Sequence, residues 1–391
     1  MPWKETDVME QKEEFIREML KNGKPFKHLC ADFGISEKTG YKWKNRFYEE
    51  GKIGLAEQSR KPKSSPTGLP EQTVIAIINL KHAHPAWGPK KILAVYQRTH
   101  KQQDVPSLSS VKRIFEKAHL IKHRKIRKAA TDSARLHQRI LPASCNDVWA
   151  IDFKGWWKSN GEICEPFTVR DLHSRFVLEI RLMESKTSEA VRAVMTELFR
   201  KYGLPKVIRS DNGTPFASNN GILSLTNLSA WWITLGIIPD RTDKGKPGQN
   251  GSLERMHADI AAEIEKKVPG GRRQNQAALD IWREEYNTFR PNEALGMKTP
   301  VEIYTPSERK YEGDFDELEY PPGFLPRKIL GNGTIALFGL RISISYSLKG
   351  LTIGLKDIGN GKFHVFLADF LLGELRTDLC CFSPLDSLES I

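Results

Sequence analysis

The order of periodic segments after residue 143 constrains the fold of this 391-residue chain more than any other feature. Short apolar runs predict strands at Val148–Phe153, Glu162–Val169, Phe176–Leu182, Val207–Ser210 and Ile237–Asp240. Helical spacing of apolar residues predicts helices at Thr187–Tyr202, from near Ser252 onward, and at Ala277–Phe289. Three early strands followed by alternating helices and strands are typical of a mixed sheet flanked by helices. We therefore expect a central α/β core over residues 143–310.

A helix-turn-helix unit is predicted over residues 1–58. Helical spacing over residues 7–22 and Lys27–Phe33 is followed by Gly34 as a turn residue, and Ser36 is the expected N-cap of a helix through Glu50. A recognition helix meets the DNA major groove through its outward polar side chains. On the third helix these are Lys38, Thr39, Lys42 and Asn45. A small helical bundle with a solvated basic face is the alternative interpretation.

A second helical unit, winged-helix or homeodomain-like, is expected over residues 70–120, after a Pro/Ser linker. Its helices are predicted at Glu71–His82, Gly88–Arg98 and Ser107–Ala118, and the last one presents Lys112 and Arg113 as DNA-binding candidates. A basic tract follows, in which we expect phosphate contacts from Arg124, Lys125, Arg127 and Lys128.

Positive charge is concentrated in the part of the chain that precedes the predicted core. Residues 1–140 contain 29 Lys and Arg against 15 Asp and Glu, whereas the rest contains 31 against 33. A basic region of this kind suits a polyanionic partner such as double-stranded DNA. A basic surface that serves only solubility is the alternative.

A small all-β barrel or sheet is expected over residues 325–385. Arg341–Tyr346 alternates between polar and apolar residues, and Phe363, Val365 and Leu367 repeat at period two. The segments 331–333 and 359–361, both Gly-Asn-Gly, are predicted hairpin turns.

Three acidic residues occupy the positions in the predicted core where metal chemistry would be expected. Asp152 lies at the end of the first strand, Asp211 directly follows the fourth, and Glu254 lies in the first turn of a helix. Three carboxylates can hold two Mg²⁺ or Mn²⁺ ions, and paired ions promote in-line displacement at phosphodiesters.

Each acid also has a purely structural interpretation. Asp152 could be an ordinary strand-end residue, Asp211 an Asx-turn residue, and Glu254 a charge favoured by the helix dipole. Asp171, which precedes Arg175 closely, is interpreted as a structural residue of a turn or salt bridge.

The motifs around these acids resemble those of DDE transposases of bacterial insertion sequences, which have a retroviral-integrase-type catalytic core. The matching stretches are residues 149–155 (WAIDFKG), 211–216 (DNGTPF), 245–255 (GKPGQNGSLER), 286–291 (YNTFRP) and 299–304 (TPVEIY). The resemblance implies a ribonuclease H-like fold, with Asp152, Asp211 and Glu254 as the metal-binding catalytic triad. It also implies a homodimer or higher homo-oligomer assembled on two DNA ends.

The chain departs from the pattern of these relatives in three places. The spacing between Asp211 and Glu254 is longer than is typical of the superfamily, and Asn292 stands where relatives often have His. Many relatives carry Lys or Arg at the position of Ala261, so Arg255 or Lys266 would have to contact the terminal DNA instead.

These features lead to the expectation of a transposase. It would bind the terminal inverted repeats of a mobile element, cleave the strand at each end and join the freed end to target DNA. The alternatives are a non-catalytic DNA-binding regulator derived from a transposase, and a nuclease of the same fold without strand transfer. A serine or tyrosine recombinase is disfavoured, because no Ser or Tyr lies in a recognisable nucleophile context.

Cysteine and apolar content point to a cytoplasmic, nucleoid-associated protein. Five cysteines form neither a disulfide framework nor paired zinc spacing, which favours reduced thiols. No apolar signal core opens the chain, and the longest apolar run, 231–238, is too short to span a bilayer. No membrane partner is therefore expected.

Overall fold

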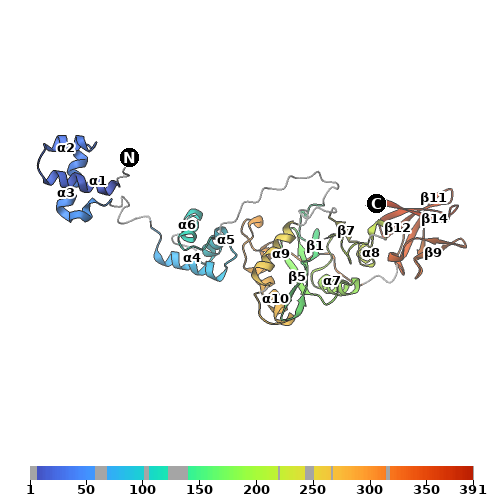
Figure 1. The fold of residues 1–391 in the computed structure, drawn as a ribbon. Coiled ribbons are helices and arrows are strands. Elements are labelled where there is room, and N and C mark those ends of the chain that lie inside the picture. The colour runs from blue at the N-terminus through green and yellow to red at the C-terminus, as the bar shows by residue number, and fades with distance from the viewer. Residues whose placement is uncertain are drawn as a thin grey trace. The chain divides into compact units, whose positions relative to one another are not determined.

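The computed structural model describes residues 7–57, 68–100, 105–121, 140–218, 221–242, 251–265, 267–313 and 318–390 (Figure 1). The chain divides into two compact units, Met1–Gly68 and Leu69–Ile391.

The first unit is a helix-turn-helix, as the sequence predicts. Its helices are α1 (Val8–Leu20), α2 (Phe26–Asp32) and α3 (Glu37–Glu50). Gly34 has a φ of +65°, which supplies the turn, and the Ser36 hydroxyl caps α3 by accepting the Thr39 N–H. A Cβ at Gly40 would lie 2.5 Å from the Cys30 Sγ, so only glycine allows α3 to approach α2 this closely. The buried core consists of Phe15, Ile16, Leu29, Cys30, Trp43 and Leu55.

The second unit begins with three more helices, α4 (Glu71–Ala83), α5 (Pro89–Thr99) and α6 (Leu108–Lys117). Ile77, Ile92, Val111 and Phe115 are among the side chains that form their shared core. These helices contact the α/β core directly. Examples are an ion pair of 3.1 Å between His84 Nδ1 and Glu285 Oε1 and a hydrogen bond of 2.7 Å from the Arg98 guanidinium to the Met297 carbonyl oxygen.

The α/β core contains a five-stranded mixed sheet in the order β5-β4-β1-β6-β7. The strands are β1 (Val148–Phe153), β4 (Pro166–Asp171), β5 (Val177–Leu182), β6 (Val207–Ser210) and β7 (Ile238–Arg241). β1 runs antiparallel to β4 and parallel to β6, so it is the central strand. The predicted three early strands followed by parallel α/β units therefore form one mixed sheet.

One predicted strand is wrong. Residues 162–169 form two strands, since β3 (Glu162–Cys164) pairs with β2 (Trp157–Ser159) in a separate hairpin and β4 pairs with β1. The change of partner occurs at Glu165 and Pro166. Pro166 has no N–H to donate, which is tolerated at the first residue of a strand.

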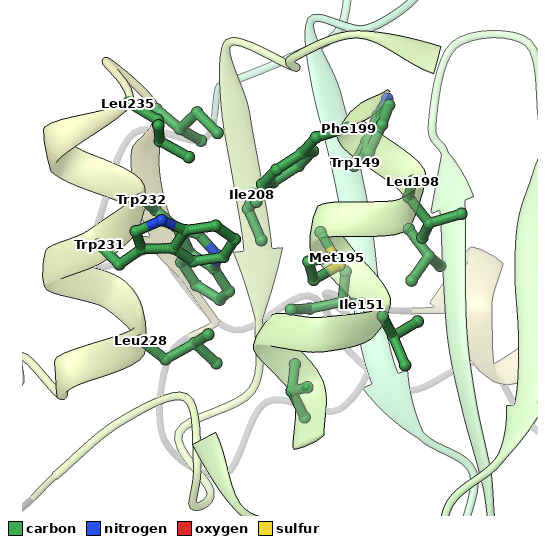
Figure 2. Packing of buried hydrophobic residues seen from close by; sticks show 14 of the residues in the cluster. Trp149, Ile151, Met195, Leu198, Phe199, Ile208, Leu228, Trp231, Trp232 and Leu235 are labelled. Carbon is green, nitrogen blue, oxygen red and sulfur yellow. The ribbon is translucent and has the colours of Figure 1, made fainter. Parts of the chain in front are cut away.

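Helices cover both faces of this sheet. α7 (Ser188–Tyr202) and α8 (Asn227–Thr234) pack on one face, and α9 (Gly251–Glu263) and α10 (Arg272–Thr288) pack on the other. Figure 2 shows the first of these layers, in which Phe199 of α7 and Trp231 of α8 lie over Ile208 of β6. Along β1, Trp149 and Ile151 point to this layer, and Val148 and Ala150 point to the α9–α10 layer.

The predicted order of elements places a helix between the fourth and fifth strands, where α8 lies, but no bounds were predicted for it. Trp231 and Trp232 pack on the sheet of the α/β core, whereas Ala230 and Ile233 belong to the core of the C-terminal strands. α8 is therefore apolar around its circumference, and the amphipathic pattern that identifies surface helices is absent.

The C-terminal region is all-β, as predicted. An antiparallel sheet has the order β14-β13-β12-β11-β8, and a separate ladder pairs β10 with β9. The strands are β8 (Phe324–Lys328), β9 (Thr334–Leu337), β10 (Leu340–Ser343), β11 (Thr352–Gly359), β12 (Lys362–Leu367), β13 (Phe370–Arg376) and β14 (Cys381–Ser390).

Of the two predicted hairpin turns, the one at residues 359–361 joins the paired strands β11 and β12. The turn at residues 331–333 does not close a hairpin, because β8 before it pairs with β11 and β9 after it pairs with β10.

Asp171 has the structural role that the sequence suggests. Its side chain is fully buried and accepts hydrogen bonds from the Asn146 N–H at 2.8 Å, the Ser174 N–H at 2.8 Å and the Ser174 hydroxyl at 2.5 Å. The two Ser174 donors close the turn between β4 and β5, and the Asn146 N–H ties this turn to the segment before β1. Asp171 is thus a turn residue, and its carboxylate oxygens bond to these donors rather than to the Arg175 guanidinium.

We expect Asp171→Ala to lower the free energy of unfolding by roughly 2–4 kcal/mol, because it leaves buried donors without an acceptor. Chemical denaturation of the full chain measures this loss. Asp280→Ala, at an exposed carboxylate on α10, serves as the control and should change stability little. Equal stability of the two variants would contradict the assignment.

Candidate active site

Two of the three acidic residues lie at neighbouring carboxyl ends of parallel strands. The register pairs Ala150 of β1 with Arg209 of β6, so the same register carried two residues further places Asp152 beside Asp211. Side chains two residues apart on a strand lie on the same face of the sheet. Asp152 therefore points, like Val148 and Ala150, toward the α9 layer. Sheet geometry alone brings these two carboxylates to one edge of the core.

The backbone holds Asp211 in a tight turn. Its Oδ1 accepts the Gly213 N–H at 3.1 Å, and a Cβ at Gly213 would lie 3.0 Å from its Oδ2. The Asn212 side chain donates to the Thr242 carbonyl oxygen and anchors the turn to the end of β7. The Asx-turn interpretation of Asp211 is therefore correct as geometry, and the turn fixes the direction of the carboxylate.

Glu254 lies in the first turn of α9, with an exposed side chain. Its neighbours Leu253 and Met256 are buried against the sheet. Their packing fixes the orientation of α9 about its own axis. The Arg170 guanidinium donates to the Ser252 carbonyl oxygen at 2.6 Å, which ties the first turn of α9 to β4.

Burial and like charge raise the pKa of Asp152 to about 7. Burial is the larger cause, the Asp211 carboxylate adds repulsion, and the Glu254 carboxylate adds a smaller share. Lys186 opposes the shift. The three acids therefore share one electrostatic environment at the end of β1. Over the described ranges, however, no three His, Cys, Asp or Glu side chains already form a cluster ready to bind a metal.

His257 was not among the predicted site residues. It lies one turn after Glu254 on α9, and its Nδ1 is 4.0 Å from the Asp152 Oδ2. The Thr168 hydroxyl donates to the Asp152 carbonyl oxygen at 3.1 Å, so at 2.9 Å it accepts from His257 Nε2. Burial, with the nearby charges of Lys154 and Arg170, lowers the pKa of His257 to about 4.

The imidazole is thus neutral near pH 7, and its unprotonated Nδ1 faces the Asp152 carboxyl group. The i, i+3 spacing from Glu254 on one helix was the signal that could have identified His257.

The candidate DNA-binding residues lie on exposed surfaces wherever the structure describes them. On α3, Lys38, Lys42 and Asn45 are exposed, whereas Thr39 is half-buried and its hydroxyl lies 2.9 Å from that of Ser36. Thr39 thus contributes to the cap of the helix. Further along the chain, Lys112 and Arg113 of α6 are exposed, and Arg124, Lys125, Arg127, Lys128 and Lys266 lie outside the described residues.

On α9, the half-buried Ala261 offers no charge, and the exposed Arg255 lies next to Glu254 with its Nε 3.5 Å from the Asp259 carboxylate.

None of the helices in the described ranges has the length and apolarity that a bilayer crossing requires.

Comparison with known families identifies the domains. Residues 142–247 and residues 235–300 match two descriptions of an integrase core domain. Residues 11–63 match a helix-turn-helix domain, and residues 39–115 match a homeodomain-like domain. The chain therefore carries an integrase core domain behind helix-turn-helix segments.

The related proteins come from mobile elements. A 31.7 kDa protein of insertion element IS407 from Burkholderia multivorans is 25% identical over 254 residues, which cover 64% of this chain and 87% of that protein. A 39.2 kDa protein of insertion element IS476 from Xanthomonas euvesicatoria is 25% identical over 255 residues, which cover 64% of this chain and 69% of that protein. These matches confirm the resemblance to insertion-sequence transposases.

Two solved structures are also similar. The HTLV-2 integrase catalytic core domain in complex with magnesium has a TM-score of 0.33 and 17% identity, covering 42% of this chain and 99% of its own. The simian T-cell lymphotropic virus intasome in complex with a PP2A regulatory subunit has a TM-score of 0.36 and 14% identity, covering 76% of this chain and 98% of its own.

Because the folded state holds a proton on Asp152 that the unfolded state has released, the contribution of Asp152 to the free energy of unfolding should fall as pH rises from about 4 to about 7. Asp152→Asn removes this dependence. Between pH 5 and pH 8, the free energy of unfolding of the variant should therefore rise by roughly 1–3 kcal/mol relative to that of the wild type. Denaturation in EDTA measures the difference. His257 titrates in both proteins and cancels, so a difference that is constant with pH would contradict the shift.

Proposed function

We propose, from an integrase core domain joined to helix-turn-helix segments, that the chain is a transposase acting on a mobile element. It binds the terminal inverted repeats, cleaves a DNA strand at each end and transfers that strand to target DNA. The observation that carries the proposal is the in-register placement of Asp152 and Asp211 at the end of the central strands, with Glu254 acting on the same electrostatic environment.

The donor set suits a hard divalent cation. All three candidate ligands are carboxylates, which Mg²⁺ and Mn²⁺ prefer. Burial raises the pKa of Asp152 most, and the like charges nearby raise it further. A cation would relieve the repulsion between these charges. Two such ions held by Asp152, Asp211 and Glu254 would stabilise charge on phosphoryl oxygens and supply a nucleophile from water at neutral pH. We propose Mg²⁺ or Mn²⁺ as the cofactor on this ground.

The chain's own residues would prepare this site. Asp152, part protonated near pH 7, would release its proton to solvent when cations bind, and the neutral His257 Nδ1, 4.0 Å from the Asp152 Oδ2, would stay unprotonated beside it. The Gly213 N–H holds the Asp211 carboxylate in place. Glu254, exposed on the first turn of α9, would complete the set of carboxylate ligands.

The chemistry on DNA takes place in two displacements. Water attacks a phosphorus at the element end, a new P–O bond forms and the bond to the 3′ oxygen breaks, leaving a 3′-hydroxyl on the element. That hydroxyl then attacks a target phosphodiester in line and expels the target's 3′ oxygen. Neither step needs a covalent bond between protein and DNA, so no Ser or Tyr nucleophile is required.

The DNA-binding surface is proposed to include α3 and α6. The exposed Lys38, Lys42 and Asn45 lie on the helix that follows the turn, the place of a recognition helix. Lys112 and Arg113, together with the basic tract beyond them, would contribute phosphate contacts. Two ends must be joined in one event, so we propose a homodimer or higher assembly on DNA, in the nucleoid.

Asp211→Asn should abolish cleavage of an end-containing duplex while leaving its binding unchanged. The substitution keeps the shape and the turn acceptor but removes a charge from the site, which we expect to cost on the order of 10³-fold or more in rate. Cleavage with Mg²⁺ and gel-shift binding measure the two properties on the same protein.

The alternatives give different results in this assay. Retained cleavage by Asp211→Asn would refute the assignment of the acid. A wild type that binds but never cleaves with Mg²⁺ or Mn²⁺ would be a DNA-binding regulator. Cleavage without joined products on a target plasmid would indicate a nuclease of the same fold.

Asn45→Ala should reduce the preference for the element end over unrelated duplex. A side-chain amide that reads a base edge contributes about 1–3 kcal/mol of discrimination, whereas a lysine on phosphate does not discriminate. Competition binding measures the ratio, and Lys38→Ala is the matched comparison, which should weaken both duplexes alike. An unchanged ratio for Asn45→Ala would remove it from the readout surface.

A further inference from the structure

A cavity of about 450 Å³ lies beside the first turns of α9, separate from the three acids. It is bounded by α5, by the ends of β4 and β5, by α9 and by the segment after α10. The charged side chains that line it are Lys91, Arg170, Arg175, Arg255, Asp259 and Glu293. The cavity thus joins the second helical unit to the integrase core.

Two cations in this cavity have no acceptor in the described part of the chain. The side chains of Lys91 and Arg175 are half-buried, and neither makes a hydrogen bond or salt bridge to any described residue. Burial, with the nearby Arg290 and Arg255, lowers the pKa of Lys91 to about 8. Burial, with the nearby Arg170, lowers the pKa of Arg175 as well. A half-buried cation that lacks a direct acceptor favours binding of an anion, and Lys91 and Arg175 are two such cations in one cavity.

The acids of the cavity do not supply that anion. Asp259 pairs with Arg290 at 2.8 Å, and Arg290 is itself almost fully buried. Glu293 pairs at 3.0 Å with Lys90, the exposed neighbour of Lys91. Arg170 directs its guanidinium to the carbonyl oxygens of Arg175 and Ser252. Lys91 and Arg175 therefore lack a direct acceptor among the described residues, and the carboxylates of Asp259 and Glu293 act on Lys91 only without a direct contact.

The site suits a phosphate group better than a carboxylate-bearing side chain. A guanidinium and an ammonium that line the same cavity can each donate to a non-bridging oxygen of a phosphodiester. The cavity is open to a ligand of this size, and Ser252 and Arg255 at its rim lie within one residue or two of Glu254. A phosphate held here would fix a DNA strand next to the proposed catalytic acid.

We propose that this cavity binds one backbone phosphate of the DNA, with Lys91 of α5 and Arg175 after β4 as its positioning residues. The inference rests on the proposed function, because it takes DNA as the ligand. Under this proposal, the second helical unit and the integrase core contact the same DNA strand. It also gives a physical reason for the otherwise unpaired Lys91.

The test is the salt dependence of DNA binding by the full chain in EDTA, so that cleavage plays no part. Lys91→Met keeps the length of the side chain and removes its charge. Its slope of log Kd against log salt should fall, by at most about 0.9, the value for one whole phosphate contact, because Arg175 still faces the same phosphate. Arg175→Met should act alike. Lys90→Met is the matched control and should keep the wild-type slope, because Lys90 pairs with Glu293 outside the proposed contact.

Thermal unfolding without DNA separates a lost contact from a damaged fold. Lys91→Met removes a half-buried charge that has no direct acceptor, so its midpoint should equal or exceed that of the wild type. A lower midpoint together with a wild-type slope would overturn the proposal. So would equal slopes for Lys91→Met, Arg175→Met and Lys90→Met in stable proteins.

Inorganic phosphate distinguishes the source of the oxyanion. If phosphate raises the midpoint of the wild type but not of Lys91→Met, and the DNA slopes also differ, the DNA site is supported. Phosphate could raise the midpoint of the wild type but not of Lys91→Met while the salt-dependence slopes of DNA binding stay equal in the two proteins. In that case the cavity is a small-anion site and the DNA proposal is wrong. A wild type that binds no duplex at all refutes the proposed function itself.

Discussion

Repulsion between carboxylates at the end of β1 is the interaction on which the proposed activity depends. Asp152 and Asp211 are brought together because β1 and β6 are parallel and in register, and neither strand can shift while both faces of the sheet are packed. The cost of this arrangement is visible in Asp152, whose pKa rises to about 7 through burial and through the charges of Asp211 and Glu254. A site in which carboxylates lie this close together favours the binding of a cation.

Helix α9 connects this site to the rest of the protein. Its buried residues Leu253 and Met256 lie on the sheet, and Glu254 and His257 are carried on the same first turns. The other flank of the same turns borders the basic cavity that contains Lys91. A strand of DNA bound in that cavity would therefore act on the helix that carries the third acid. Binding and chemistry would be coupled through one rigid element.

Sequence patterns predicted those parts of the fold whose local signals agree with their tertiary role. The apolar run of β1, the cap at Ser36 and the turn at Gly34 are examples. The patterns failed where long-range packing decides. α8 is buried between the integrase core and the C-terminal strands, so it shows no amphipathic period. The strand over residues 162–169 divides because its halves pair with different partners. Within the candidate site, the three acids were predicted from strand ends and a helix start. His257 had only the weak signal of its i, i+3 spacing from Glu254, and Lys91 becomes a candidate only through residues distant in the chain.

The most direct test of the central claim is an anomalous diffraction measurement on crystals of the chain soaked in Mn²⁺. The account predicts density peaks about 2.0–2.2 Å from carboxylate oxygens of Asp152 and Asp211, with Glu254 drawn toward them. Mn²⁺ bound only elsewhere on the protein, with the end of β1 left without a peak, would contradict it.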